Sequence, residues 1–364
     1  MKPSIKNKVI IACAGGRKTT HLVEEALKIV DEPVLITTYT LENLDQIYSY
    51  IVERKGFVPS NIRLDSWFTF LLHDFIRPYQ NNVFPNIEKV ETLDFNSTPP
   101  RGLRKDDSRY YFNRSNGIYR DRASDYAYRC NEVTTGLVIK RLEQVYKHIF
   151  IDEAQDLAGW DLNLVKLLFD SSIDTFMVAD PRQATYSTNR SNKNKGKRGQ
   201  NFPEWVDEQV KCLACTREDI CSSHRSVQQI CDFSDLLYPE YPQTTSQNKD
   251  ISEHDGVFIV SDDLLNEYIG TYNPVCLRFS KRTNTYGCKA INIGVSKGRT
   301  YRRVIVFPTQ PMKDFLCTGD ITKAGDRSKF YVAVTRARQS VAFVINSANI
   351  SNVRASLVSE YTTL

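Results

Sequence analysis

The chain has 364 residues, of which 41% are apolar and 25% are charged, so its composition is globular and excludes the disordered and fibrous classes. Its length suits two domains of ordinary size. The net charge is +5, from 48 basic and 43 acidic residues. No apolar run approaches the length of a membrane-spanning helix, and the run over residues 9–14 is too short for a secretory signal. Nine cysteines in a chain this long are not a disulfide framework. We therefore expect a cytoplasmic protein without a membrane partner.

The first elements in chain order form a strand–turn–helix unit. An apolar strand over residues 8–12 leads into a turn of small residues, and apolar side chains then recur at helical spacing over residues 21–30. A second apolar strand, Val34–Thr38, follows. This βαβ pattern predicts a parallel sheet covered by helices.

The turn itself, Ala12-Cys-Ala-Gly-Gly-Arg-Lys-Thr19, has the order of a phosphate-binding loop. Its backbone N–H groups and the helix N-terminus would face the phosphates of ATP, with Lys18 on the β- and γ-phosphates and the Thr19 hydroxyl on Mg²⁺. The predicted nucleotide-binding residues here are Ala14, Gly15, Gly16, Arg17, Lys18, Thr19 and Thr20. Arg17 stands where this motif has glycine, so it either slows catalysis or adds a phosphate contact.

Two later strands are each followed by polar residues that suit the same chemistry. Asp152 and Glu153 follow an apolar strand over residues 148–151. Asp152 would hold Mg²⁺, and Glu153 would polarise the attacking water. Charges at the end of a buried strand are costly unless they bind something. After a further strand over residues 175–179, Gln183 could sense the γ-phosphate. Apolar runs over residues 303–307 and 340–345 predict two more strands.

Two segments concentrate positive charge. Residues 101–122 hold seven Arg or Lys against three Asp, with four aromatic residues between them, and residues 187–203 hold five basic residues and no acid. Such segments suit a nucleic-acid backbone and stacked bases, although solvated loops explain them equally well. Residues 186–203 are polar and interrupted by glycine, which predicts a flexible connection between two lobes.

These segments, with others in the same order, resemble the motifs of superfamily 1 DNA helicases of the UvrD/Rep/PcrA type. Residues 152–156 (Asp-Glu-Ala-Gln-Asp) resemble motif II, and 180–186 (Asp-Pro-Arg-Gln-Ala-Thr-Tyr) resemble motif III. The other segments are similar to motifs Ia (34–40), Ib (64–72), IV (222–226), V (293–301) and VI (330–338). Seven motifs in this order cover essentially the whole chain.

The resemblance implies roles for particular residues. Arg336 would be the arginine finger, Arg225 a γ-phosphate contact, and His224 would take the place of an adenine-stacking tyrosine. Gly298 in motif V would contribute to nucleotide binding. The candidates for nucleic-acid contact are Tyr39, Thr40, Trp67, Phe68 and Tyr186. For Trp67 and Phe70, however, core packing is the favoured interpretation.

The resemblance also implies the fold and the activity. The fold would be α/β, with two RecA-like lobes over residues 1–190 and 204–364, a basic connection over 191–203 and only small insertions, the first over about 76–145. The expected function is an ATP- and Mg²⁺-dependent translocase or helicase acting on single-stranded DNA or a single-strand/double-strand junction.

Three alternatives remain. The chain could be a nucleotide-gated regulatory ATPase that controls a partner nuclease or other effector without unwinding, or an inactive scaffold that has lost hydrolysis through Arg17. Separately, Cys212, Cys215, Cys221 and His224 have a spacing that suggests zinc, but it is short for two ligand pairs, so buried thiols are favoured.

Overall fold

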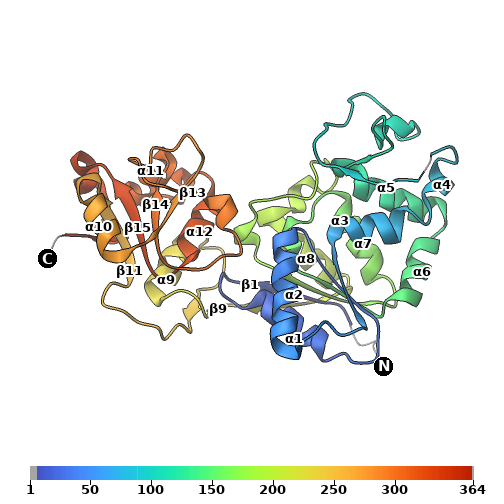
Figure 1. Cartoon of the computed structure of the whole chain (residues 1–364), viewed down its shortest axis with the longest axis horizontal. Coiled ribbons are helices and arrows are strands. Elements are labelled where there is room, and N and C mark those ends of the chain that lie inside the picture. Colours follow the sequence, from blue (N-terminus) through green and yellow to red (C-terminus); the bar gives the residue numbers. More distant parts are fainter. Residues whose placement is uncertain (1–5, 88, 363–364) are drawn as a thin grey trace. The chain divides into compact units, whose positions relative to one another are not determined.

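The computed structural model describes residues 6–87 and 89–362. Within them the chain forms two compact units (Figure 1). The first unit holds residues 6–11 and Lys18–Asp219, and the second holds Ala12–Arg17 and residues 220–362. The turn predicted to bind phosphate therefore packs with the second unit, although the strand before it and the helix after it belong to the first.

The first unit is built on a six-stranded sheet. Its order is β3 (Ile62–Ser66), β2 (Val34–Thr38), β6 (His148–Ile151), β7 (Asp174–Ala179), β1 (Lys8–Ala12) and β8 (Thr216–Ile220). The pairs β3–β2, β2–β6, β6–β7 and β7–β1 are parallel. Strand β2 is buried throughout, because apolar side chains and two threonines face the helices on both sides.

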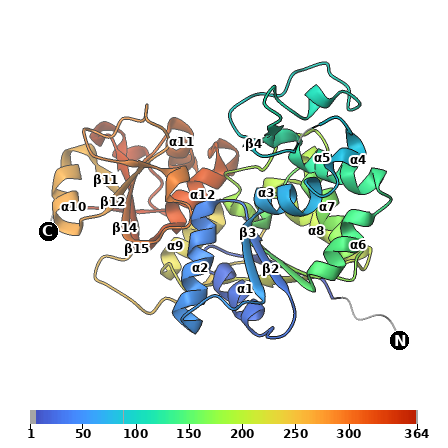
Figure 2. The same cartoon turned by 45° about the vertical axis from the view of Figure 1, so that its right-hand side comes forward.

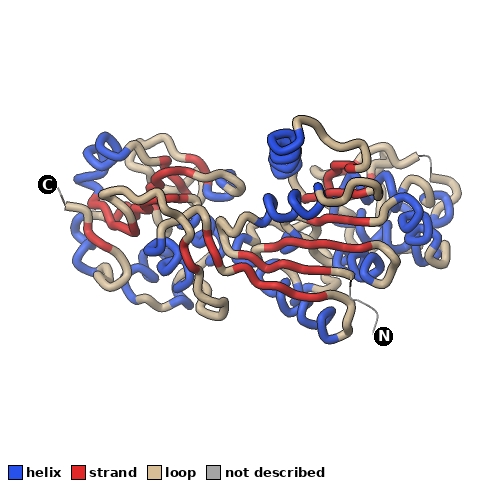
Figure 3. Tube along the Cα trace, turned by 90° about the horizontal axis from the view of Figure 1, so that it is seen from below, coloured by secondary structure: helices blue, strands red, loops and turns tan. Residues whose placement is uncertain are grey.

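Helices connect and cover these strands, and Figure 3 shows them to either side of the first sheet. They are α1 (Lys18–Leu27), α2 (Leu41–Lys55), α3 (Trp67–Phe70) with a π-helical turn (Leu71–Ile76), α4 (Gln80–Val83), α5 (Arg120–Val133), α6 (Leu137–Val145), α7 (Trp160–Phe169) and α8 (Phe202–Lys211). A two-stranded pair, β4 (Leu93–Asp94) and β5 (Ile118–Tyr119), lies in the first insertion.

The second unit repeats this architecture (Figure 2). Its six-stranded sheet has the order β13 (Ile291–Asn292), β12 (Val275–Arg278), β14 (Tyr301–Phe307), β15 (Ala337–Ile345), β11 (Gly256–Ser261) and β16 (Ser359–Glu360). All five pairs of neighbouring strands are parallel. Its helices are α9 (Gln228–Leu236), α10 (Leu265–Tyr272), α11 (Gln310–Thr318) and α12 (Arg327–Thr335), and a small pair joins β9 (Ser222–Ser223) to β10 (Thr245–Ser246). The predicted α/β fold with two parallel sheets is confirmed.

The boundary between the units lies later than the sequence predicts, between residues 219 and 220 rather than within 191–203. The segment predicted as a flexible connection packs inside the first unit. Asn189 is buried and its amide donates to Ala158 O at 2.7 Å, while the Asn194 amide donates to Gly159 O at 2.8 Å. Asparagine is common in linkers, but here its amide groups satisfy buried backbone carbonyls instead.

The aromatic residues of the basic segment 101–122 also differ from expectation. Tyr111, Phe112 and Tyr119 are buried, and the Tyr111 and Phe112 rings pack on Tyr126 of α5 with centroid distances of 4.9 and 5.0 Å. They form the core of the insertion, so they offer no face to a base. No helix in the described part of the chain has the length and apolarity needed to cross a bilayer.

Candidate nucleotide site and aromatic surface

Parallel strands bring the predicted polar residues to one edge of the first sheet. The carboxyl ends of β1, β7, β6 and β2 lie at that edge, because β1 pairs with β7, β7 with β6 and β6 with β2. Asp180 follows β7, Asp152 follows β6, and Tyr39 follows β2. Ligands of open α/β sheets bind at such an edge.

A direct contact joins the start of α1 to the end of β6. The Thr19 hydroxyl donates to Asp152 Oδ2 at 2.7 Å, and Lys18, the first residue of α1, is buried beside them. Thr20 continues the first turn of the helix and is half-buried. The sequence predicted Thr19 and Asp152 as a shared metal site from segments more than 130 residues apart, and the fold brings these two side chains together.

Two neighbouring carboxylates give this edge a negative charge that a cation would stabilise. Asp152 is 2% exposed, and burial, together with the neighbouring Glu153 carboxylate, raises the pKa of Asp152 to about 6. A buried carboxylate, a hydroxyl and a second carboxylate suit Mg²⁺, which takes one or two protein carboxylates and completes its shell with water and phosphate oxygens. Bound there, Mg²⁺ would neutralise charge on the phosphates.

Glu153 is fixed by its neighbours in an unusual backbone conformation. Its φ of 53° is left-handed, its N–H donates to Asp152 Oδ1 at 2.8 Å, and its carboxylate accepts from the Gln155 amide. The other end of Gln155 accepts from Asp180 N at 2.9 Å. Gln155 therefore ties the ends of β6 and β7 together and orients Glu153. The sequence alone assigns Gln155 no role, although this residue lies within the segment 152–156 that resembles motif II.

Gln183 lies at the same edge, and its side chain is engaged by a neighbouring residue of the chain. Its amide donates to Asp180 Oδ2 at 2.7 Å, and Arg182 Nε donates to Asp180 Oδ1 at 3.0 Å. Asp180 and Arg182 form a buried ion pair. Asp180 thus positions both residues, a role that the sequence did not indicate.

The loop Ala12–Arg17 is held by residues of motifs IV and VI. The Ala14 N–H donates to the Tyr331 hydroxyl at 3.1 Å, the Ser223 hydroxyl donates to Ala14 O at 2.8 Å, and His224 N–H donates to Gly15 O at 2.9 Å. Gly15 has a φ of +76°, and a Cβ there would come within 2.5 Å of Ser223 Oγ. Glycine is therefore required at this position.

The other loop residues differ in exposure. Gly16 is buried, and its N–H donates to Cys13 O at 3.0 Å. Arg17 is exposed and has a left-handed φ of 54°, which is strained for any residue but glycine, asparagine or aspartate. His224 is exposed as well, and its pKa is lowered by partial burial and by the charge of Arg17.

The predicted arginines of the second unit donate to backbone carbonyls. Arg225 Nη1 donates to Thr335 O at 3.0 Å. Arg336 is buried, with Nε donating to Val332 O at 3.3 Å and Nη1 to Arg299 O at 3.2 Å. Gly298 lies just before Arg299 with a φ of +83°. The motif V turn thus supports Arg336 directly.

Three aromatic side chains from separate segments, Tyr39, Tyr186 and Phe95, lie around the buried Phe68 in the first unit, and we term these three the aromatic surface. The Tyr39 ring lies 5.8 Å from Phe68 and 6.4 Å from Tyr186, and Phe68 lies 5.3 Å from Phe95. Tyr186 and Phe95 are 41% and 53% exposed, whereas Phe68 is buried beneath them. The sequence predicted Tyr39 and Tyr186 but missed Phe95, because its segment gave no motif signal.

Three of the predicted nucleic-acid residues are structural. Trp67 is buried, and its indole N–H donates to Asp161 Oδ1 at 2.8 Å. The side chain of Thr40 accepts from Asn43 N at 3.2 Å and caps α2. The base-stacking roles predicted for Trp67 and for the buried Phe68 are therefore not retained, and core packing describes both rings.

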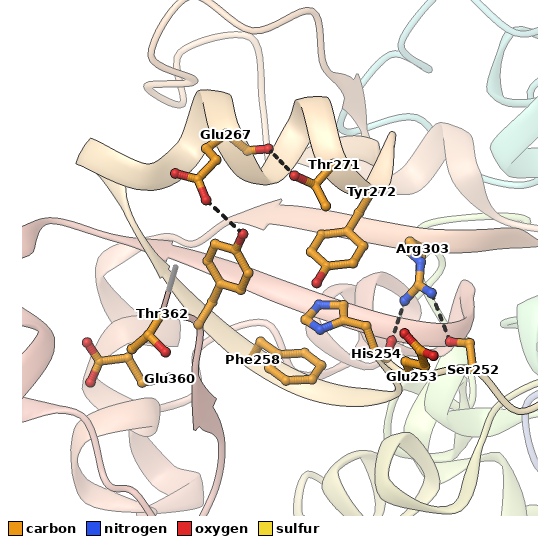
Figure 4. A pocket seen from close by; sticks show the side chains of 11 residues that line it. Ser252, Glu253, His254, Phe258, Glu267, Thr271, Tyr272, Arg303, Glu360 and Thr362 are labelled. Atoms are coloured by element: carbon orange, nitrogen blue, oxygen red, sulfur yellow. Dashed lines mark hydrogen bonds between the residues drawn. The ribbon is translucent and has the colours of Figure 1, made fainter. Parts of the chain in front are cut away.

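A separate cavity of about 850 Å³ lies in the second unit, beside β11, α10 and the residues after β16 (Figure 4). His254 stacks there between Phe258 and Tyr272, each with a centroid distance of 4.0 Å, and Arg303 donates to His254 O and, at 2.8 Å, to the Ser252 hydroxyl. Burial, aided by Arg303, lowers the pKa of His254 to about 4. The stacked rings and the Arg303 hydrogen bonds hold the imidazole in place, so we assign His254 to packing in the wall of this cavity.

The cysteines show no metal-binding arrangement in the described part of the chain. No group of three or more His, Cys, Asp or Glu side chains there could hold a metal ion. Among the residues of the zinc alternative, Cys212 is exposed, Cys215 is buried and Cys221 is half-buried.

The two units thus have the architecture of a P-loop α/β protein, with a candidate nucleotide site at the carboxyl ends of the strands of the first sheet. In a comparison with protein families, residues 79–195 match the UvrD/REP helicase N-terminal domain. The resemblance to UvrD/Rep helicases is confirmed over this stretch, which includes the insertion and motifs II and III. The chain therefore carries a helicase-type ATPase domain.

Among solved structures, the chain is similar to the arterivirus nonstructural protein 10 helicase, with 14% identity and a TM-score of 0.49. That alignment covers 97% of this chain and 62% of the viral one. The same viral helicase in complex with DNA matches with 14% identity and a TM-score of 0.49, over 95% and 63% of the two chains. The chain thus spans less than two thirds of the length of these viral proteins. No curated protein matches it in sequence.

Proposed function

We propose that this protein is an ATP-driven motor that hydrolyses ATP with Mg²⁺ and translocates on single-stranded DNA. The observation that carries the proposal is the contact between Thr19 and Asp152, with Glu153 beside it, at the carboxyl edge of the first sheet. A hydroxyl and two carboxylates placed next to a buried lysine are the parts that phosphoryl transfer to water needs.

Each residue has a stated part in the proposed reaction. Lys18 binds the β- and γ-phosphates, Thr19 and Asp152 hold Mg²⁺, and Glu153 accepts a proton from the attacking water. Gln183 reports on the γ-phosphate once it leaves Asp180. Arg225 and Arg336 supply positive charge to the phosphates, and His224 and Gly298 line the base and sugar.

The aromatic surface supports single-stranded DNA as the partner. Bases stack on aromatic rings without regard to sequence, at about 1–3 kcal/mol per base. Tyr39 and Tyr186 follow β2 and the β7 turn, so the same sheet edge carries the nucleotide site and the aromatic rings. Asp180 lies in the same short segment as Tyr186, and its N–H donates to Gln155 Oε1 at 2.9 Å, so a change at the nucleotide site has a direct route to this ring.

The test is DNA-stimulated hydrolysis in matched tyrosine variants. Tyr39→Ala and Tyr186→Ala should each weaken binding to an oligothymidylate by about 1–3 kcal/mol and reduce its stimulation of hydrolysis. Tyr48→Ala, at an exposed position of α2, is the control and should change neither. If both variants bind and respond to DNA like the control, the aromatic surface is not the DNA site.

The second candidate is a nucleotide-gated switch that controls an effector protein. It is favoured by the loop Ala12–Arg17, whose Ala14 N–H already bonds to Tyr331 and whose Arg17 side chain replaces a glycine. A switch predicts hydrolysis with little response to DNA and no displacement of a bound strand. The motor predicts both stimulation and directional displacement.

A further inference from the structure

A small polar pocket borders the aromatic surface in the first unit. It has a volume of about 100 Å³, and Phe95 of the aromatic surface is one of its walls. Its other walls come from residues Asp94 and 96–98 in the insertion, from Arg120 and Asp121 at the start of α5, and from Arg190 after motif III. Three segments distant in sequence thus converge on it.

The pocket is lined by two arginines and two aspartates, which differ in their partners. Asp94 is engaged as an acceptor, from the Asn113 amide at 2.7 Å and from Ser97 N at 2.9 Å. Asp121 pairs with Arg120, with Arg120 Nη2 at 3.1 Å from Asp121 Oδ1. Among the described residues, Arg190 forms no hydrogen bond or ion pair. Arg190 is exposed, so its guanidinium N–H groups remain available to a ligand.

Arg120 also connects the pocket to the ring that we propose for base stacking. Burial raises the pKa of Tyr39, and the nearby Arg120 guanidinium opposes that rise. Arg120 thus lies against the Tyr39 hydroxyl on one side and lines the pocket on the other. The pocket and the stacking rings are neighbours, as the phosphate and base of one nucleotide are.

We propose that this pocket binds a backbone phosphodiester of the single strand whose bases stack on Tyr39, Tyr186 and Phe95, with Arg190 as the principal contact and Arg120 as the second. The inference rests on the proposed function, and it adds the insertion and the loop after motif III to the DNA site. The ligand is an anionic oxygen of a phosphodiester, and planar guanidinium groups bind such oxygens well.

The experiment pairs one arginine with one phosphate. A set of oligothymidylates, each with one neutral methylphosphonate linkage, is bound to the full chain by fluorescence anisotropy. At one linkage the neutral group should weaken wild-type binding roughly tenfold, as expected for a charged hydrogen bond. The Arg190→Ala variant should bind the unmodified strand more weakly than wild type by a similar factor. In this variant the neutral linkage should cause no additional loss of affinity.

Arg114→Ala is the matched control, because it removes the same charge from an exposed position of the insertion outside the pocket. This control variant should show the same loss of affinity as wild type when that linkage is neutral. The slope of log affinity against log salt should fall by about 0.7 in Arg190→Ala. Retention of the penalty in Arg190→Ala, or equal behaviour of the two variants, would overturn the phosphodiester site.

The outcomes distinguish failure of the phosphodiester pocket from failure of the proposed motor function. If wild-type protein binds DNA and is stimulated by it while Arg190→Ala behaves like Arg114→Ala, only the pocket proposal fails. If wild-type protein binds no oligonucleotide, both proposals fail. Binding of inorganic phosphate that Arg190→Ala abolishes, without any linkage-specific penalty on DNA, would assign the pocket to a free anion and overturn the phosphodiester.

Discussion

The Thr19 hydroxyl and the Asp152 carboxylate are hydrogen bonded at 2.7 Å, which joins the first turn of α1 to the end of β6. Each group is a potential Mg²⁺ ligand, and in the structure each partly satisfies the other. Mg²⁺ bound there would be held by these two side chains and would supply charge neutralisation to the phosphates. The pair therefore marks the place where nucleotide chemistry is expected.

Glu153→Gln should lower turnover by about two orders of magnitude or more and leave nucleotide binding intact, because it removes the general base and keeps the side-chain shape. Turnover is measured by phosphate release and affinity with a fluorescent nucleotide. Glu143→Gln, at a partly exposed position of α6, is the control for loss of one carboxylate. Unchanged turnover in Glu153→Gln would remove this residue from the mechanism.

Arg336→Ala should reduce turnover far more than nucleotide affinity, since an arginine finger acts on charge that develops in the transition state and is worth roughly 10³–10⁵. Arg336 is buried, so the melting temperature is measured alongside. Arg338→Ala, whose guanidinium forms an exposed ion pair with Asp250 at 3.5 Å, should behave like wild type. Lost affinity with normal turnover would make Arg336 an ordinary binding residue.

Arg17→Gly should hydrolyse ATP at an equal or higher rate and should raise the melting temperature. Glycine relieves a left-handed φ of 54°, which costs other residues about 1–2 kcal/mol. Leu213→Gly, at an exposed residue with a φ of 58°, tests the same relief away from the site and should leave hydrolysis unchanged. A collapse of hydrolysis in Arg17→Gly alone would show that this arginine binds phosphate.

Tyr331→Phe should bind nucleotide about two- to tenfold more tightly, because it frees the Ala14 N–H for a phosphate oxygen at the loss of one neutral hydrogen bond. Tyr238→Phe is the control. Its hydroxyl pairs with Ser328 at 3.1 Å, and its ring packs on Tyr331 in the same core, so the variant removes a hydroxyl from the same environment. Equal or weaker binding in Tyr331→Phe would show that the tyrosine does not compete with phosphate.

His254 should make stability depend on pH in the acidic range. Its pKa in the folded protein is about 4, against an ordinary value of 6.5, so the unfolded chain takes up the proton first. The stability that the neutral imidazole contributes is complete above pH 6.5 and is lost as the pH falls toward 4. Melting temperatures across this range should fall less steeply in His254→Phe, which keeps the stack.

The Tyr268→Phe variant distinguishes an effect of His254 titration from the loss of the hydrogen bond between His254 and Tyr268. It removes the 2.8 Å hydrogen bond between Tyr268 and His254 but retains the imidazole, so its pH dependence should match that of wild type apart from a constant offset. If His254→Phe and wild type lose stability in parallel between pH 6.5 and 4, other groups cause the dependence.

Strong apolar runs made part of the fold predictable. The strands Val34–Thr38 and His148–Ile151 are confirmed at the predicted bounds, since each is a buried run with clear ends. The first helix begins at Lys18, three residues before the apolar repeat, because its first turn is polar and faces the phosphate loop. Strands β11 and β12 were not predicted, as short runs of this kind carry little periodicity.

Site residues that lie in a sequence motif were predictable, whereas those brought together only by tertiary packing were not. Asp152 and Thr19 could be paired in advance because the chemistry requires both. Phe95 joins the aromatic surface only through its edge contact with Phe68, and Arg190 lines a pocket only because Asn189 anchors its segment beside α7. Such contacts depend on tertiary structure, and nothing in the local sequence specifies them.

The most direct test of the central claim is ATP hydrolysis by the full chain, with and without Mg²⁺ and with and without single-stranded DNA. The account predicts hydrolysis that requires Mg²⁺, rises when an oligothymidylate is added and disappears in Glu153→Gln. An absence of hydrolysis in the presence of both Mg²⁺ and DNA, or an equal rate in Glu153→Gln, would contradict it.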